Sequence, residues 1–140
     1  MTVHHLALGV HDLDAQSDFY SRILGLQLVQ WHHDEAGERR SAWLALGEGA
    51  FLALEKVGRA PRLEEAWHDD APGYFLLALR IDVNERERWE ARLREHGIAI
   101  HHRTQWTLYF RDPEGNRVAL SHHPEERQAL QSAEKATGPR

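Results

Sequence analysis

The stretch His5-Leu6-Ala7-Leu8-Gly9-Val10 decides the fold, because its core, Leu6-Ala7-Leu8, returns as Leu77-Ala78-Leu79, 71 positions later. Each copy is followed by a segment of helical length that stops at a glycine, Gly25 or Gly97. The ends of the two halves correspond as well, Leu52-Ala53-Leu54 with Val118-Ala119-Leu120. A repeat this long and present twice indicates two copies of one supersecondary unit, since a solenoid needs about three or more repeats.

Each copy has the pattern of a strand, a helix and three further strands. In the first copy Val3 to Val10 forms the strand, Asp12 or Asp14 caps the helix, and short β runs follow at about 26–33, 41–47 and 50–56. In the second copy Asn84 is the expected N-cap, with Glu87 completing a capping box, and β runs follow at about 98–104, 106–111 and 116–122. The pattern predicts an α+β fold of two βαβββ modules.

The modules are expected at residues 3–57 and 74–123, within a single domain that ends at residue 124. A linker containing Pro61 and Pro72, residues 58–73, separates them, and a polar tail occupies residues 125–140. Two hairpin turns are expected, Gly47-Glu48-Gly49 and Asp112-Pro113-Glu114-Gly115-Asn116, because proline suits the first central position of a turn and glycine supplies positive φ.

Composition excludes several classes of protein. There are no cysteines among the 140 residues, which rules out disulfide frameworks, cysteine nucleophiles and thiolate metal sites. The net charge of −5 argues against a nucleic-acid partner. No apolar run approaches the roughly 18 residues of a membrane span, and no signal pattern opens the chain, so we expect no membrane partner and a cytoplasmic location.

Strand alternation predicts a ligand cavity on one face of the sheets. Leu6, Leu8 and Val10 point to one side of the first strand, and the bulky aliphatic residues of the matching strands behave alike. The opposite face carries small residues: Ala7, Gly9, Ala53, Ala78 and Ala119. Small side chains leave space over a curved sheet, and a concavity with a few polar groups is the default site for a small molecule. A neighbouring chain or the linker filling that space is the alternative.

These motifs together resemble the vicinal oxygen chelate superfamily of glyoxalases, bleomycin-resistance proteins, fosfomycin-resistance enzymes and extradiol dioxygenases. The resemblance rests on His5 to Leu13, Phe19-Tyr20, Leu24-Gly25-Leu26 and the run Tyr109 to Asn116, and it covers residues 3–123. It implies two βαβββ modules that form a curled mixed sheet around a cleft, often completed by dimerisation. It therefore implies a small-molecule ligand and a homodimer.

The resemblance also implies four metal-ligand positions, of which this chain keeps one. His5 matches the first, whereas the other three fall on Leu76, Ala53 and Ala119. Three protein ligands are usual even at an open catalytic site, so no metal cofactor is expected. Glu55 lies two residues beyond Ala53 on the same predicted face, and a displaced site at His5 and Glu55 is the alternative.

Further residues are predicted to line the pocket. His5, as an acid–base residue, and Tyr109, at the position of a pocket tyrosine in fosfomycin-type enzymes, are the candidate catalytic residues, and packing is the alternative role for each. Arg80 faces inward beside Ala78 and needs a carboxylate, or else reaches solvent. The remaining lining candidates are the aromatic walls and one member of two histidine pairs: Trp43, Trp106, His102 and His123.

Two functions follow from this pattern. The first is metal-independent binding of a small molecule, as in bleomycin-resistance-type proteins. The second is an enzyme of glyoxalase, fosfomycin-resistance or dioxygenase type that uses an atypical metal site at His5 and Glu55. Since one fold hosts many chemistries, the motifs leave the ligand open. A structural dimer without a ligand is a third possibility.

Overall fold

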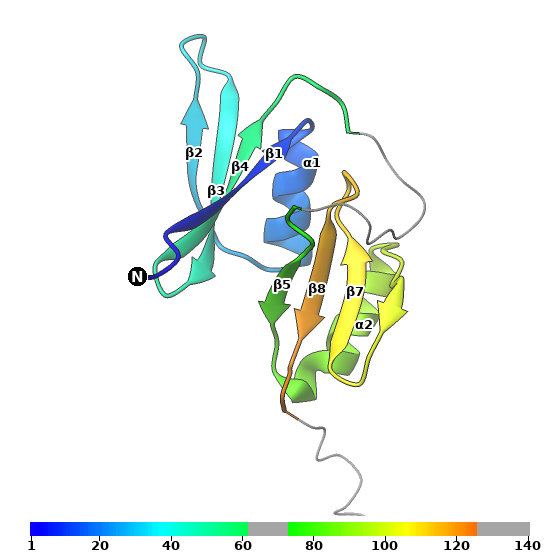
Figure 1. The fold of residues 1–140 in the computed structure, drawn as a ribbon. Coiled ribbons are helices and arrows are strands. Elements are labelled where there is room, and N and C mark those ends of the chain that lie inside the picture. The colour runs from blue at the N-terminus through cyan, green and yellow to red at the C-terminus, as the bar shows by residue number, and fades with distance from the viewer. Residues whose placement is uncertain (62–72, 126–140) are drawn as a thin grey trace, which may run out of the picture. The chain divides into compact units, whose positions relative to one another are not determined.

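The computed structural model describes residues 1–61 and 73–125, and its first module has the expected order of elements (Figure 1). Strand β1 (His5–Val10) leads into helix α1 (Leu13–Asp18), which continues as a π-helical turn, η1 (Phe19–Ile23). Strands β2 (Leu28–His33), β3 (Arg39–Gly47) and β4 (Ala50–Lys56) follow. They form a four-stranded sheet in the order β1-β4-β3-β2, with β1 parallel to β4 and the other pairs antiparallel.

The second module repeats this arrangement. Strand β5 (Leu77–Arg80) is followed by a short turn of 3₁₀ helix, η2 (Val83–Glu85), and by helix α2 (Arg86–Glu95). Strands β6 (His102–Arg103), β7 (Thr107–Arg111) and β8 (Arg117–Ser121) complete a sheet in the order β5-β8-β7-β6. The predicted βαβββ repeat is confirmed, and its strands form two separate four-stranded mixed sheets.

The register shows that the repeated motifs occupy equivalent places. Ala7 on β1 lies opposite Ala53 on β4, and Ala78 on β5 lies opposite Ala119 on β8. Both pairs join the first strand of a module to its last strand in parallel. The two Leu-Ala-Leu motifs are therefore structurally equivalent strands.

The helix ends follow the expected chemistry in one module and depart from it in the other. Asp12 caps α1, and its carboxylate accepts a hydrogen bond from the Ala15 backbone N–H at 3.0 Å. The prediction that Asn84 caps the second helix is wrong. Asp82 takes that role, because its carboxylate accepts from the Asn84 N–H at 2.7 Å and starts the 3₁₀ turn that precedes α2. Glycines at positive φ, Gly25 and Gly97, follow the helices as predicted.

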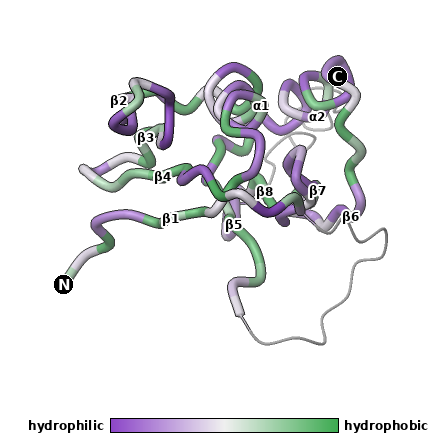
Figure 2. Tube along the Cα trace, turned by 90° about the horizontal axis from the view of Figure 1, so that it is seen from above, coloured by the Kyte–Doolittle hydropathy of each residue, from purple (hydrophilic) through white to green (hydrophobic). Residues whose placement is uncertain are grey.

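The aliphatic face of each sheet is buried over its inner strands, whereas the leucines of the first strands, Leu6, Leu8, Leu77 and Leu79, are half-buried. Leu44, Leu52 and Leu54 of the first sheet have no exposed surface, and α1 packs against β3 and β4. Leu108, Val118 and Leu120 are the corresponding buried residues of the second sheet. Hydrophobic and hydrophilic stretches alternate along the chain trace accordingly (Figure 2). We call the opposite face of each sheet its outer face.

The chain forms two compact units whose boundaries differ slightly from the modules. One unit comprises Met1–Phe75 with Arg111–Arg117, and the other comprises Leu76–Phe110 with Val118–Arg140. The turn between β7 and β8 therefore belongs to the first unit. Most of the predicted linker and nearly all of the predicted tail lie outside the described residues. Within the described residues, no helix is long and apolar enough to cross a membrane.

Candidate functional site

Four rings form a continuous band across the outer face of the first sheet. The His5 imidazole stacks on the Phe51 ring at 5.0 Å, with 11° between the planes, and Phe51 stacks on Trp43 at 4.3 Å. The His32 ring lies 4.3 Å from that of Trp43. The band therefore runs over all four strands, in their spatial order β1-β4-β3-β2. We refer to His5, Phe51, Trp43 and His32 as the aromatic band.

A polar row lies beside this band. His32 is opposite Ser41 in the register, Ser41 is opposite Glu55, and Glu55 is opposite Gly9. The Ser41 hydroxyl donates a hydrogen bond to Oε1 of Glu55 at 2.8 Å, which leaves the second carboxylate oxygen as an acceptor. The outer face thus combines a stack of aromatic rings with a carboxylate.

The small side chains on the outer face of the first sheet make room for the rings of the aromatic band. Trp43 is opposite Ala53, and Phe51 is opposite Ala45, so the two rings meet diagonally across alanines. Ala53 is only 2% exposed, whereas Ala7, its neighbour on β1, is exposed. The small side chains leave room for the stacked rings, and the accessible part of this face lies towards β1.

The residues at the superfamily's metal positions do not fit a metal. Ala53 and Ala119 have no donor atom, and neither has Leu76. His5 is opposite Phe51 and Glu55 is opposite Gly9, so four strand positions, about 13 Å, separate them along the strands. They are too far apart to share an ion, and the displaced site at His5 and Glu55 does not form. Within residues 1–61 and 73–125, no group of three or more histidines and acids is placed to hold a metal.

Of the residues predicted in the second module, Tyr109 and His102 lie on the outer face of the second sheet, whereas Trp106 and His123 lie beyond the strand ends. Tyr109 is opposite His102, with ring centroids 5.6 Å apart. Trp106 and His123 contact each other edge to face at 4.8 Å. Ala78 is exposed, Ala119 is buried beside it in the register, and Leu76 is half-buried just before β5.

Arg80 reaches solvent at the end of β5. Its guanidinium lies 3.7 Å from the Glu125 carboxylate, and both side chains are more than half exposed. An ion pair of this kind contributes little to stability. Of the two roles that the sequence left open for Arg80, the structure shows the solvent-exposed one, with Glu125 as its neighbour.

The Asp112 to Asn116 motif anchors the β7–β8 turn to the first helix. Asp112 is 5% exposed and accepts hydrogen bonds from the Tyr20 hydroxyl, the Glu114 and Asn116 backbone N–H groups and the Asn116 side chain, all at 2.9–3.0 Å. Burial, and next the charge of Asp112, raise the pKa of Tyr20 well above its usual value. The motif has a structural role, which explains why the turn belongs to the first unit.

Glu114 reinforces this anchor at the start of α1. Its two carboxylate oxygens accept from the His11 backbone N–H at 2.7 and 3.0 Å, and one of them also accepts from the Gln16 side chain. The turn thus provides an acceptor for the His11 backbone N–H, which precedes the helix, as a capping residue would. Glu114 thus connects the β7–β8 turn to the start of α1, two segments that are far apart in the sequence.

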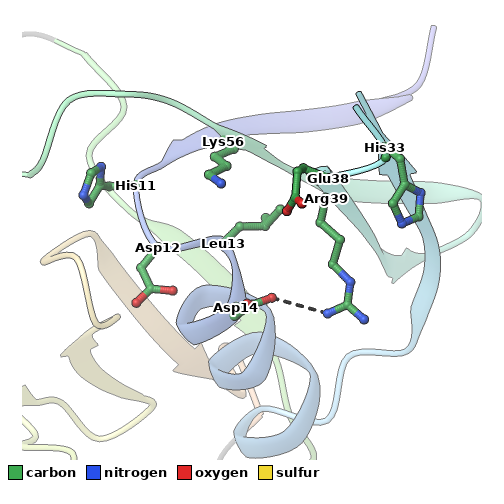
Figure 3. A pocket seen from close by; sticks show the side chains of 9 residues that line it. His11, Asp12, Leu13, Asp14, His33, Glu38, Arg39 and Lys56 are labelled. Atoms are coloured by element: carbon green, nitrogen blue, oxygen red, sulfur yellow. Dashed lines mark hydrogen bonds and ion pairs between the residues drawn. The ribbon is translucent and has the colours of Figure 1, made fainter. Parts of the chain in front are cut away.

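A separate hollow of about 540 Å³ lies where the ends of the strands approach the start of α1 (Figure 3). Asp14 and Arg39 face each other across it at 3.4 Å, and Lys56 extends from the end of β4 (Figure 3). Its charged side chains are all exposed. It lies away from the aromatic band and contains none of the residues that the sequence predicted for a site.

Residues 2–120 match the family model of the Glyoxalase/Bleomycin resistance protein/Dioxygenase superfamily. The chain belongs to this superfamily. The catechol-2,3-dioxygenase of Bacillus subtilis (strain 168) is 29% identical over 122 residues, 84% of this chain, and the chain spans 40% of that relative's length.

Two solved structures of similar proteins cover nearly the whole chain. A glyoxalase/dioxygenase from Nostoc punctiforme is 28% identical with a TM-score of 0.73, over 89% of this chain and 92% of its own. TnmS3, an antibiotic binding protein from Streptomyces sp. CB03234, is 28% identical with a TM-score of 0.58, over 87% and 95%. The superfamily fold is thus shared with proteins named for catalysis and with one named for binding.

Sequence reasoning missed part of the aromatic band. Neither Phe51 nor His32 is among the site residues that the sequence predicts. Ser41 was not selected at all. The available signal was alternation, since Phe51, Ala53 and Glu55 occupy every second position of one strand. Alternation along one strand does not show which strands pair with it. The pairing of β2, β3 and β4 brings Trp43 and His32 to the same face as Phe51.

Proposed function

We propose that this chain binds a small organic molecule on the outer face of its first sheet, without a metal. The observation that supports this most directly is the aromatic band with the Glu55 carboxylate beside it. The stacked rings make this part of the face apolar, and a few polar groups next to an apolar surface fix the orientation of a ligand. The likeness to an antibiotic binding protein over 87% of the chain supports binding as the function.

A thermal-shift screen of planar and cationic small molecules tests this proposal. A ligand at a hundred times its dissociation constant is expected to add roughly 2.7 kcal/mol of stability. Ala7→Trp fills the exposed β1 end of the outer face and is expected to remove the shift. Val29→Trp adds the same bulk at an exposed position in the irregular part of β2, at the opposite edge of the sheet from β1, and serves as its control. Equal loss in both variants contradicts the assignment of this face.

Metal analysis distinguishes this function from the second candidate. The 29% identity to a catechol-2,3-dioxygenase favours an enzyme of dioxygenase or glyoxalase type, for which a divalent metal supplies the Lewis acid or binds oxygen. We expect less than a tenth of an equivalent of zinc, nickel, manganese or iron in untagged protein after mild chelator dialysis. About one equivalent that His5→Ala removes supports the enzyme and overturns metal-independent binding.

The assembly and location follow as part of the same proposal. We expect a homodimer in the cytoplasm with a small-molecule partner, as superfamily membership and the sequence suggest. Light scattering on the eluting protein measures the mass directly against the 16.2 kDa of one chain. A monomer at all concentrations contradicts the dimer and leaves the binding proposal to be decided by the screen.

A further inference from the structure

The polar row of the first sheet has a counterpart on the second sheet, with the opposite charge. In the first sheet Gly9, Glu55 and Ser41 are neighbours on β1, β4 and β3, and Ser41 donates to the Glu55 carboxylate. The equivalent residues of β5, β8 and β7 are Arg80, Ser121 and Thr107. We propose that Arg80 and Ser121 form a second binding site, beyond the proposed function, that takes the carboxylate group of a small anionic molecule.

Ser121 is shorter than Glu55, the residue at the same place in the first module. The serine oxygen stands where glutamate has its second methylene, so the carboxylate that Glu55 supplies from its own side chain has no counterpart in the second module. Ser121 is half-buried, and Ala78, the preceding outer-face residue of β5, is exposed, so solvent reaches this part of the face. A carboxylate that arrives with a ligand therefore takes the place that Glu55 fills in the first module.

The hydroxyl pair of the second sheet leaves one proton for a ligand. Thr107 is 8% exposed, and its Oγ1 lies 2.9 Å from Oγ of Ser121. Because a buried hydroxyl needs a partner within the protein, we assign the proton of this bond to Thr107. The Ser121 oxygen then accepts from Thr107 and from the His123 backbone N–H at 3.3 Å, and its own O–H is available to an acceptor on the ligand.

The Arg80 guanidinium supplies the positive charge from the other side of Ser121. The strand order β5-β8-β7 puts Arg80 and Thr107 on opposite flanks of Ser121, so the bond to Thr107 leaves the β5 side of the serine for the ligand. A carboxylate has two acceptor oxygens, and a guanidinium presents several N–H donors in one plane. One carboxylate oxygen accepts from Arg80 and the other accepts from the Ser121 hydroxyl.

The charge of the second sheet favours an anion over a neutral molecule. Its strands contain four arginines and no acidic residue, the arginines being Arg80, Arg103, Arg111 and Arg117. A surface with charge of one sign raises the local concentration of ligands of the opposite sign. The first sheet differs, because its outer face carries the Glu55 carboxylate.

Glu125 is the group that the ligand displaces from Arg80. Its carboxylate lies 3.7 Å from the guanidinium, which is longer than a hydrogen bond, and the two side chains are 55% and 69% exposed. An exposed ion pair of this kind contributes little free energy. A ligand carboxylate that bonds to both Arg80 and Ser121 gains a hydrogen bond that Glu125 does not make, so it replaces Glu125 beside the guanidinium.

Benzoate and benzamide test this proposal, because they differ only in whether one group is a carboxylate or a neutral amide. Amide chemical shifts of the full chain, followed by NMR during titration, measure the binding of each. We expect benzoate to bind about fivefold more tightly than benzamide, the range of an exposed charge pair. Arg80→Gln is expected to abolish this preference. Arg88→Gln is the matched control, since Arg88 is also exposed and also pairs with a glutamate, Glu85, and it is expected to preserve the preference.

Two further variants separate the hydroxyl from the charge. Ser121→Ala removes the hydroxyl donor and is expected to weaken benzoate binding by about threefold or more. Glu125→Gln removes the competing carboxylate and is expected to strengthen benzoate binding about twofold.

Absence of benzoate binding, equal binding of benzoate and benzamide, or a preference that survives Arg80→Gln overturns the proposal. Unchanged benzoate binding in Ser121→Ala also overturns it, because Arg80 then attracts anions without a built site. Weaker binding in Glu125→Gln has the same consequence, since the site requires Glu125 to leave Arg80. Each of these results leaves the proposed function of the first sheet to its own ligand screen.

Discussion

The outer faces of the two sheets have the same backbone plan and different chemistry. In both, an alanine of the first strand faces an alanine of the last, Ala7 with Ala53 and Ala78 with Ala119. In both, a hydroxyl on the third strand bonds to the last strand: Ser41 to Glu55 at 2.8 Å, and Thr107 to Ser121 at 2.9 Å. The repeat thus preserves positions rather than side-chain functions.

The difference arises at three of these positions. Trp43 and Phe51 of the first face correspond to Tyr109 and Arg117 of the second, and Glu55 corresponds to Ser121. Arg117 stacks over Phe75 at 4.3 Å instead of joining a band. The first face is therefore aromatic and acidic, and the second is mixed and basic. A duplicated scaffold tolerates this divergence because outer-face residues are not required for the aliphatic core.

The two turn aspartates provide the sharpest test of how the modules differ in stability. Asp112→Ala removes the acceptor of four hydrogen bonds in a buried setting and is expected to lower the free energy of unfolding by about 4 kcal/mol. Asp34→Ala, in the exposed β2–β3 turn, removes two backbone hydrogen bonds and is expected to cost about 1 kcal/mol. Urea denaturation measures both, and similar losses would show that burial of Asp112 matters little.

Helices α1 and α2 also differ in how much one polar side chain stabilises the fold, since α2 carries a buried arginine. Arg86 is 6% exposed and donates to the Thr104 and Gln105 carbonyls at 2.8 and 3.1 Å and to Nε2 of His122 at 3.3 Å. Arg86→Ala leaves these acceptors unpaired and is expected to cost about 3 kcal/mol. The matched change is Arg22→Ala, which breaks an exposed pair with Asp18 and is expected to leave the free energy of unfolding nearly unchanged. An equal cost in thermal unfolding refutes the contrast.

The neutral tautomer of His122 follows from this network. Because arginine only donates, Nε2 of His122 accepts, and Nδ1 carries the proton that it donates to the Glu125 carbonyl at 2.6 Å. His122 has no exposed surface. The nitrogen chemical shifts of its ring are expected to show protonation at Nδ1, and protonation at Nε2 would contradict the Arg86 contact.

Alanine substitutions at the aromatic positions are expected to lower the free energy of unfolding less than those at the buried polar positions. Trp43→Ala removes a ring that contacts both Phe51 and His32 and is expected to cost about 2 kcal/mol, below the full value for a core residue because Trp43 is half-buried. Tyr109→Ala, at the corresponding position, is expected to cost about 1 kcal/mol. Chemical denaturation of the two variants side by side tests this order, and a larger loss for Tyr109→Ala reverses the comparison of the faces.

Among the fully buried groups, the smallest expected effect is that of the Tyr20 hydroxyl. Tyr20→Phe removes one hydrogen bond to Asp112 and is expected to cost about 1 kcal/mol at neutral pH. Because the pKa of Tyr20 is raised in the folded state, its stabilising contribution is complete below the unfolded value of 10.0 and is lost as the pH rises above it. The wild type is therefore expected to lose its advantage over Tyr20→Phe above about pH 10. A constant difference in unfolding free energy up to about pH 11 contradicts the raised pKa.

Local patterns in the chain predicted much of this. The repeated Leu-Ala-Leu runs, the glycines after the helices and the alternation of faces all depend on residues close in sequence, and each is confirmed by the strands, the positive φ values and the buried leucines. The wrong N-cap prediction, Asn84 in place of Asp82, also comes from using only residues close in sequence. Asp82 and Asn84 are both good caps, and the choice between them depends on how the chain leaves β5.

The amino-acid sequence by itself thus determined the two modules, their buried faces and the loss of three ligand positions, because a strand has a period of two and a missing donor atom cannot be restored by folding. The tertiary structure alone decided that Phe51, Trp43 and His32 form one band, that Glu55 stands four strand positions from His5, and that Asp112 fastens a distant turn to Tyr20. The physical reason is register. Strand pairing and turn docking select which distant side chains become neighbours, and no local pattern encodes that selection.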